Sequence, residues 1–223
     1  MVSSIAKSLE METKMKTIIF GATGTIGKLA VRQMLNDGHE VTAFARTPSK
    51  LGMTHPMLSL FAGDATDEAV VASAIKGHDA VVITLGSGMS RKSLIRSTGT
   101  MSVIRGMQVH GVERLICQST LGAHESWDNL NFFWKRIMFG MLIRPVFLDH
   151  ELQEKLVRAS GLNWTIVRPG AFADGPATGA FKENFGPTDR SLTLEISRAD
   201  IANFLSRQLS DTRYAHKVVG ISN

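Results

Sequence analysis

A glycine-rich segment near the start of the chain has the spacing of a phosphate-binding turn. Residues 21–27 read GATGTIG and lie between a short apolar run and a segment whose apolar residues recur at helical spacing. Gly21 permits a tight turn, Gly24 lets the backbone approach a pyrophosphate, and Gly27 lets the helix pack close to the strand. The N–H groups and the positive end of the helix would face the anion. The residues expected to contact a dinucleotide here are Gly21, Thr23, Gly24, Thr25, Ile26 and Gly27.

The charges after the second apolar run distinguish between the two nicotinamide dinucleotides. An NAD(H) site usually carries Asp or Glu about twenty residues after the turn, where it binds the ribose hydroxyls. In this chain Arg46 and Lys50 occupy that region, and no acidic residue follows before Asp64. A guanidinium forms paired hydrogen bonds to a 2′-phosphate, and Lys50 adds a second cation. NADP(H) is therefore favoured over NAD(H), with solvated loop charges as the alternative.

Residues after the third and fourth predicted strands complete the expected cofactor contacts. Asp64, with Ala65 beside it, can accept the adenine amino group, or it can cap the helix that begins near Asp67. Leu85 and Gly86 end the fourth predicted strand, where small residues let the backbone lie along the cofactor.

These residues need a scaffold of parallel strands, and the hydrophobic pattern predicts one. Apolar strands alternate with amphipathic helices, which is typical of a parallel sheet covered on both faces. We expect an α/β fold, namely a Rossmann-type doubly wound parallel sheet in a single NAD(P)-binding domain over residues 15–223. A flexible N-terminal tail is expected at 1–14, and small substrate-side elements at 120–147 and 170–195. The predicted strands are 16–20, 40–45, 57–62, 79–85, 114–119, 163–168 and 217–221, and the predicted helices are 25–37, 67–75, 94–110, 150–160 and 198–209.

Composition argues against several other classes of protein. The chain has 223 residues and a net charge of +5, yet no run of Lys and Arg alternates with aromatic residues as in a nucleic-acid-binding surface. No apolar stretch is long enough to span a membrane, and the first residues lack the apolar block of a secretory signal. The histidines show no metal-ligand spacing, although His124 and His150 could approach the cofactor cleft. We predict no nucleic-acid partner, no membrane span, no metal and a cytoplasmic location, as a monomer or weak homodimer.

Several segments together resemble the atypical short-chain dehydrogenase/reductase group. They are the turn at 21–27, GDATD at 63–67, SGLNWTIVRPG at 160–170 and SRADIA at 197–202. Within that group the chain is similar to the NAD(P)H-binding proteins related to biliverdin-IXβ reductase, also called flavin reductase, and to NmrA-like proteins. This likeness rests on Arg46 with Lys50, on QST at 118–120 and on PATGAF at 176–181.

The resemblance implies roles for residues at the ends of the fifth and sixth strands. Ser119 matches the active-site serine of the flavin reductase, so it is the expected catalytic residue and a cofactor contact. Pro169 and Gly170 match the segment that passes the nicotinamide. The family enzyme has a histidine just after that proline, whereas this chain has Gly170 and Ala171.

The larger group polarises a carbonyl with a Tyr and a Lys four residues apart, and this chain lacks the pair. Phe147 and Glu151 occupy the expected positions, and the single tyrosine, Tyr214, is not followed by a lysine at that spacing. No hydroxyl with a lowered pKa is then available to protonate an alkoxide, which disfavours ordinary alcohol and ketone chemistry. Hydride transfer to a flavin requires less of the protein, which must bind the cofactor and the flavin, align their rings and exclude water from the site.

An aromatic and methionine-rich segment at 131–144 is the expected acceptor site. Phe133 and Trp134 there, with Ala171 and Phe172 after the sixth strand, could stack a planar ligand. The segment could instead fill the core or form a partner interface. The function that fits best is an NADPH-dependent reductase that transfers hydride to a flavin or a similar planar acceptor, such as a bilin or a quinone-like compound. The alternatives are a non-catalytic NADP(H)-binding sensor and a tailoring reductase or isomerase for an aromatic substrate.

The charge pattern predicts that NADPH binds about tenfold more tightly than NADH, or better. Arg46 and Lys50 would face the 2′-phosphate that NADH lacks, and a tenfold ratio needs only about 1.4 kcal/mol. Fluorescence titration of the protein with both cofactors measures the ratio. Equal affinities, or tighter binding of NADH, would contradict the role assigned to these cations.

Overall fold

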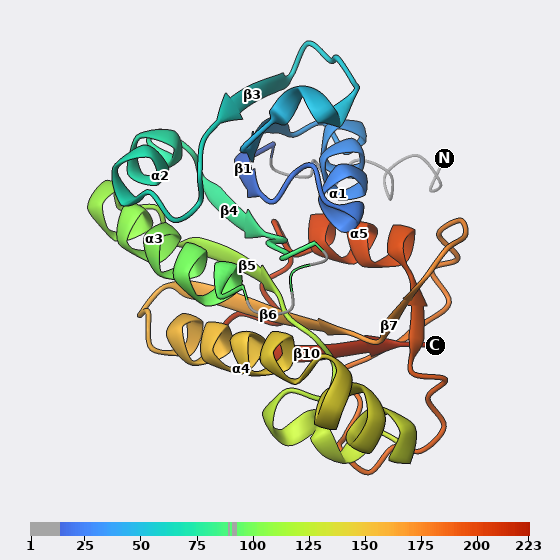
Figure 1. Cartoon of the computed structure of the whole chain (residues 1–223). Helices are drawn as coiled ribbons and strands as arrows, with labels where there is room; N and C mark the ends of the chain where they lie inside the picture. Colours follow the sequence, from blue (N-terminus) through green and yellow to red (C-terminus); the bar gives the residue numbers. More distant parts are fainter. Residues whose placement is uncertain (1–13, 89, 91–92) are drawn as a thin grey trace, which may run out of the picture.

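Parallel strands form the centre of the molecule, and helices cover both faces (Figure 1). The computed structural model describes residues 14–88, 90 and 93–223. Its eight-stranded sheet has the order β3-β2-β1-β4-β5-β6-β10-β8, and the described pairs are parallel except for β10 with β8. This arrangement confirms the predicted Rossmann-type doubly wound sheet. The predicted tail at 1–14 lies outside the described residues except for Lys14.

The elements follow the predicted alternation of strand and helix. The strands of the main sheet are β1 Lys16–Phe20, β2 Glu40–Ala45, β3 Leu58–Ala62, β4 Ala80–Ile83, β5 Arg114–Gln118, β6 Asn163–Pro169, β8 Lys182–Glu183 and β10 Lys217–Ser222, and β7 Ala171–Ala173 pairs separately with β9 Glu195–Ser197. The helices are α1 Thr25–Asn36, α2 Glu68–Ile75, α3 Ile95–His110, α4 Arg144–Arg158 and α5 Arg198–Arg207, with shorter turns η1 Pro48–Leu51 and η2 His124–Asn129 and a π-helix, η3 Phe133–Leu142. In the described ranges, no helix combines the length and the apolar character that crossing a membrane requires.

The chain winds in opposite directions on the two sides of β1. This strand pairs with β2 along one edge and with β4 along the other. Helices α1 and α5 cover one face of the sheet, and α2, α3 and α4 lie in a row on the other (Figure 1). Alternation along β1 divides the core between the faces, since Ile19 packs with the α1 and α5 side and Ile18 and Phe20 with the α2 and α3 side.

Helix α4 begins earlier than the sequence pattern predicts. The predicted start at residue 150 is wrong, because the helix runs from Arg144 with Pro145 in its first turn, where a missing N–H is tolerated. Phe147 packs into a separate apolar cluster with Phe139 and Leu130. The apolar periodicity is hard to read here because much of the buried face of this helix is polar. The buried polar side chains of α4 are Asp149, His150, Gln153 and Glu154.

This polar face joins α4 to α3. Asp149 accepts hydrogen bonds from the backbone N–H groups of Arg96 and Ser97 at 3.1 and 3.0 Å, and from the Ser97 hydroxyl at 2.5 Å. Gln153 donates a hydrogen bond to Thr100 Oγ1 at 3.0 Å. Asp149 thereby caps the N-terminus of α3, whose own N-cap residue makes no side-chain capping bond in the described structure.

The buried histidine of α4 predicts a loss of stability in acid. His150 is 8% exposed, and burial together with the nearby Arg96 cation lowers its pKa to about 3, from an ordinary value of about 6.5. Between these pH values the unfolded chain binds a proton that the folded chain does not. The free energy of unfolding therefore falls as the pH drops below about 6.5, and the share from His150 should reach roughly 2 kcal/mol near pH 5.

Urea titrations near pH 7 and near pH 5 measure this loss in the wild-type protein and in His150→Gln, which keeps a polar side chain of similar reach. Other groups contribute equally to both proteins, so the variant should lose roughly 2 kcal/mol less than the wild type on acidification. The same loss in both proteins would contradict a neutral, buried His150.

Candidate functional site

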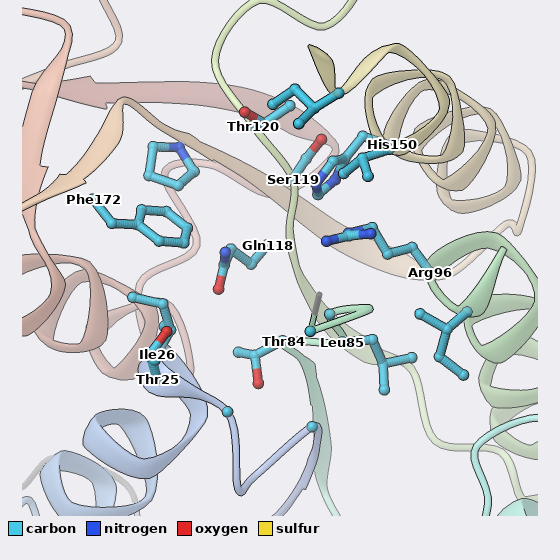
Figure 2. A pocket seen from close by; sticks show the side chains of 18 of the residues that line it. Thr25, Ile26, Thr84, Leu85, Arg96, Gln118, Ser119, Thr120, His150 and Phe172 are labelled. Atoms are coloured by element: carbon cyan, nitrogen blue, oxygen red, sulfur yellow. The ribbon is translucent and has the colours of Figure 1, made fainter. Parts of the chain in front are cut away.

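A cavity of about 790 Å³ opens where the carboxyl ends of β1, β4, β5 and β6 meet. Ligands of doubly wound sheets bind at this place, because the reversal in strand order leaves a crevice there. The glycine turn borders one side of the cavity, and Arg96, His150 and Ser119 lie on the other (Figure 2). The predicted site residues that line it are Gly21, Thr23, Gly24, Thr25, Ile26, Arg46, Asp64, Ala65, Leu85, Gly86, Ser119, Trp134, Pro169, Gly170, Ala171 and Phe172. Gly27, Lys50 and Phe133 lie outside the lining.

Backbone geometry requires glycine at two positions of the turn. Gly21 has a φ of 87°, and a Cβ there would lie 2.6 Å from the Thr84 carbonyl oxygen. A Cβ on Gly27 would overlap the Gly21 oxygen, so Gly27 serves the close packing of α1 and not ligand contact. Among the described residues, α1 has no side-chain cap and no acidic residue in its first turn. Its N-terminal N–H groups are therefore available to an anion.

The adenine end predicted from the sequence carries a cation and a carboxylate. Arg46 and Asp64 line it, and Asp64 accepts hydrogen bonds from the N–H and the hydroxyl of Thr66 at 2.9 and 2.8 Å. These two bonds hold the pKa of Asp64 below its usual value. Asp67, and not Asp64, caps α2 through two N–H groups, which removes the capping alternative for Asp64. Lys50 is exposed on η1 and lies outside the lining, which leaves Arg46 as the cation that lines this end.

A buried network fixes the side chain of Ser119. This residue is 1% exposed, and its hydroxyl donates to Glu154 Oε1 at 2.6 Å. Glu154 is fully buried on α4 and accepts two hydrogen bonds from Arg168, at 2.8 and 2.6 Å. A carboxylate only accepts hydrogen bonds, so the hydroxyl proton of Ser119 is held by Glu154. Ser119 therefore offers the cavity an oxygen that accepts a hydrogen bond, and donating its proton to a ligand would break the bond to Glu154.

Apolar rings from η3 and α4 form one wall of the cavity. The ring centroids of Trp134 and Phe139 lie 5.6 Å apart, those of Phe139 and Phe147 lie 4.7 Å apart, and all three residues line the cavity. Phe133 is 49% exposed and meets Trp134 edge-on from outside, so it does not lie where a cavity ligand would contact it. Phe172 on β7 lies across the pocket from Ser119 (Figure 2). The segment at 131–144 thus supplies both a cavity wall and part of an apolar cluster.

Two important residues were not singled out from the sequence. Arg96 lines the cavity, and Glu154 lies beneath Ser119. A signal existed for Glu154, because Arg168 follows an apolar run in its strand and a buried cation needs an anionic partner. Of the two histidines placed near the cleft, His150 lines the cavity, whereas the ring of His124 contacts the Glu151 carbonyl outside the lining. Within the described residues, no three His, Cys, Asp or Glu side chains are grouped as metal ligands would be.

Comparison with known proteins agrees with this geometry. A sequence model of the NAD(P)H-binding family matches residues 21–212. A Bacillus subtilis protein described as an uncharacterized sugar epimerase, YhfK, is 29% identical over 212 residues, covering 88% of this chain and 89% of the relative. The structure of ChuY, an anaerobillin reductase from Escherichia coli O157:H7, is 25% identical with a TM-score of 0.74, covering 92% of this chain and 96% of that one.

A further solved structure shows the same fold with a cofactor bound. It is a short-chain dehydrogenase/reductase from Veillonella parvula in complex with NADP, with a TM-score of 0.78 over 94% of this chain and 95% of that one. At 16% identity this likeness extends to the fold alone. The family match, in contrast, runs from the glycine turn through α5. The chain therefore belongs to the NAD(P)H-binding family of Rossmann-fold, oxidoreductase-like proteins.

Proposed function

We propose that this protein is an NADPH-dependent reductase that transfers hydride to a flavin or a similar planar conjugated acceptor. The observation that carries the proposal is the extent of the cavity, which continues from the glycine turn to a wall built by Trp134, Phe139 and Phe147. Flat conjugated molecules pack well against such rings. The anaerobillin reductase among the similar structures, at 25% identity, supports an acceptor of this kind.

The chain's own residues would hold the cofactor along the strand ends. The uncapped N–H groups of Thr25 and Ile26 suit a pyrophosphate, and Arg46 suits a 2′-phosphate. Asp64 would accept the adenine amino group, and Pro169 with Gly170 would bound the nicotinamide. When bound, NADPH supplies the hydride, and water supplies the accompanying proton.

The acceptor side is suited to alignment and not to proton donation. Phe147 lines the cavity at the position where the larger group carries its tyrosine, so an aromatic ring replaces the acidic hydroxyl. Ser119 would accept a hydrogen bond from an N–H group of the acceptor or of the nicotinamide carboxamide, and Glu154 keeps it in that orientation. A conjugated acceptor fits such a site, because the hydride reaches its ring without an acidic side chain at the reacting atom.

One observation favours a second candidate function, a regulator that reports NADP(H) binding to a partner. Phe132 precedes η3 and is 73% exposed, and Met141 lies within η3 and is 76% exposed. The segment that lines the cavity therefore also presents apolar side chains to the solvent. Exposed apolar groups of this kind are typical of partner surfaces when they form a patch. Enzyme and regulator differ in whether NADPH is consumed.

The reductase proposal predicts NADPH oxidation when FMN, FAD or a quinone-like acceptor is added anaerobically, so that oxygen does not consume electrons. Ser119→Ala should lower the turnover rate roughly fivefold, the effect of one hydrogen bond worth about 1 kcal/mol. Trp134→Ala should raise the KM for the acceptor roughly three- to tenfold with little change in NADPH affinity. Phe133→Ala is the matched control, because this neighbouring ring lies outside the cavity, and it should leave both values unchanged.

Tight NADPH binding without oxidation by any acceptor in a broad panel would contradict the reductase. The regulator would then be favoured, with residues 132–143 as its expected partner surface. Equal effects of Trp134→Ala and Phe133→Ala would separately contradict the placement of the acceptor.

A further inference from the structure

Arg96 is a charged side chain of the cavity to which the proposed reaction gives no role. It lies in the first turn of α3, and its side chain is 11% exposed. Figure 2 shows its guanidinium across the pocket from Thr25 and Ile26, on the side of Ser119 and His150. Removing a cation from water is unfavourable unless the protein or a ligand replaces the lost hydrogen bonds and charge.

The described residues of the protein satisfy few of the hydrogen-bond donors of this guanidinium. Within the described part of the chain its side chain makes one hydrogen bond, from Nη1 to Ser87 Oγ at 3.3 Å, and its Nε has no partner. The carboxylate of Asp149 is 3.8 Å from Nη1. That carboxylate already accepts three shorter hydrogen bonds from the N-terminus of α3. Because a guanidinium has five N–H donors, most of the donors of Arg96 have no partner among the described residues.

The charge around Arg96 is also unbalanced. Burial lowers the pKa of Arg96, and Asp149 offsets only part of that effect. Asp64 is the one carboxylate among the described lining residues, and it lies with Arg46 at the opposite, adenine end. In the proposed site the pyrophosphate and the 2′-phosphate of the cofactor would have partners of their own, at the N–H groups of Thr25 and Ile26 and at Arg46. The acceptor end therefore holds a cation whose one nearby carboxylate among the described residues, Asp149 at 3.8 Å, is shared with the N-terminus of α3.

We propose that Arg96 binds a carboxylate carried by the acceptor, so that the substrate class is planar, conjugated and anionic. The inference rests on the proposed function only in taking the occupant of this end to be the hydride acceptor. A planar guanidinium binds a carboxylate through two parallel hydrogen bonds, which fixes direction as well as position. With its ring against Trp134 and Phe139 and its carboxylate on Arg96, the acceptor would have a single orientation over the nicotinamide.

Equilibrium binding tests this proposal without turnover. Protein saturated with NADP⁺ is titrated calorimetrically with a naphthoquinone that bears a carboxylate side chain, and with the matching neutral carboxamide. The wild-type protein should bind the carboxylate about tenfold more tightly, a difference of about 1.4 kcal/mol. Arg96→Gln should bring the ratio of the two affinities close to one by weakening carboxylate binding alone. Arg96→Lys should give an intermediate ratio, because it keeps the charge and loses the paired geometry.

Arg46→Gln is the matched control, since it removes the other arginine among the described residues that line the cavity. It should weaken NADPH binding and leave the carboxylate-to-carboxamide ratio unchanged. Asp149 accepts its hydrogen bonds from the backbone N–H of Arg96 and from the N–H and hydroxyl of Ser97, so Arg96→Gln keeps all three and should unfold thermally close to the wild type. A wild-type ratio near one would overturn the proposal. So would a loss of NADPH affinity in Arg96→Gln as large as in Arg46→Gln, or equal weakening of both naphthoquinones.

Failure of the reductase proposal can be distinguished from failure of the role proposed for Arg96. NADPH oxidation is followed in a separate anaerobic assay, and its absence would contradict the reductase while an Arg96-dependent preference for the carboxylate still supported this site. Oxidation of NADPH with no such preference would overturn the role of Arg96 and leave the reductase intact.

Discussion

The reversal of strand order at β1 is the constraint on which the rest of this structure depends. Because β2 and β4 lie on opposite edges of β1, the connections that leave β1 and β4 diverge, and a crevice opens at the carboxyl ends of the strands. The same reversal directs the N-terminus of α1 toward that crevice. The turn at 21–27, which includes the uncapped N–H groups of this helix end, therefore borders the cavity. The cavity is therefore a consequence of the topology, and the loops and helices around it decide what it binds.

Helix α4 supplies the chemistry of the other half of the cavity through buried polar contacts. Glu154 holds the proton of Ser119 and pairs with Arg168, and Asp149 caps α3 beside Arg96. The first contact leaves the Ser119 oxygen on the cavity wall as a hydrogen-bond acceptor. Beside the second lies the Arg96 guanidinium, most of whose N–H groups have no partner among the described residues. Together with the aromatic wall, these groups suit a flat ligand that carries both an N–H group and an anionic group. None of these described wall groups is an acid placed to supply a proton, and this is why we propose hydride transfer to a conjugated ring over carbonyl reduction.

Local patterns predict the parts of the molecule that depend on neighbours in sequence. The strands, the turn at 21–27 and the start of α5 at Arg198 are of this kind, and the structure confirms all three. The predicted start of α4 is wrong by six residues. Asp149, His150 and Glu154 place polar side chains on the buried face of the helix and interrupt the helical spacing of apolar residues. The sequence does not single out Arg96 and Glu154 for a related reason. Their roles depend on partners that are distant in the sequence and lie on other elements. Lys50 and Phe133 were selected by their spacing in the sequence, and the structure places both outside the lining of the cavity.

The central claim is that one cavity holds the cofactor and a planar acceptor in contact, and a crystal structure of the ternary complex tests it most directly. Crystals grown with NADP⁺ and the carboxylated naphthoquinone should show the quinone ring about 3–3.5 Å from the nicotinamide carbon that carries the hydride. The ring should lie against Trp134 and Phe139 with its carboxylate on Arg96. A nicotinamide face covered by protein side chains, with the quinone absent or bound elsewhere, would contradict the account.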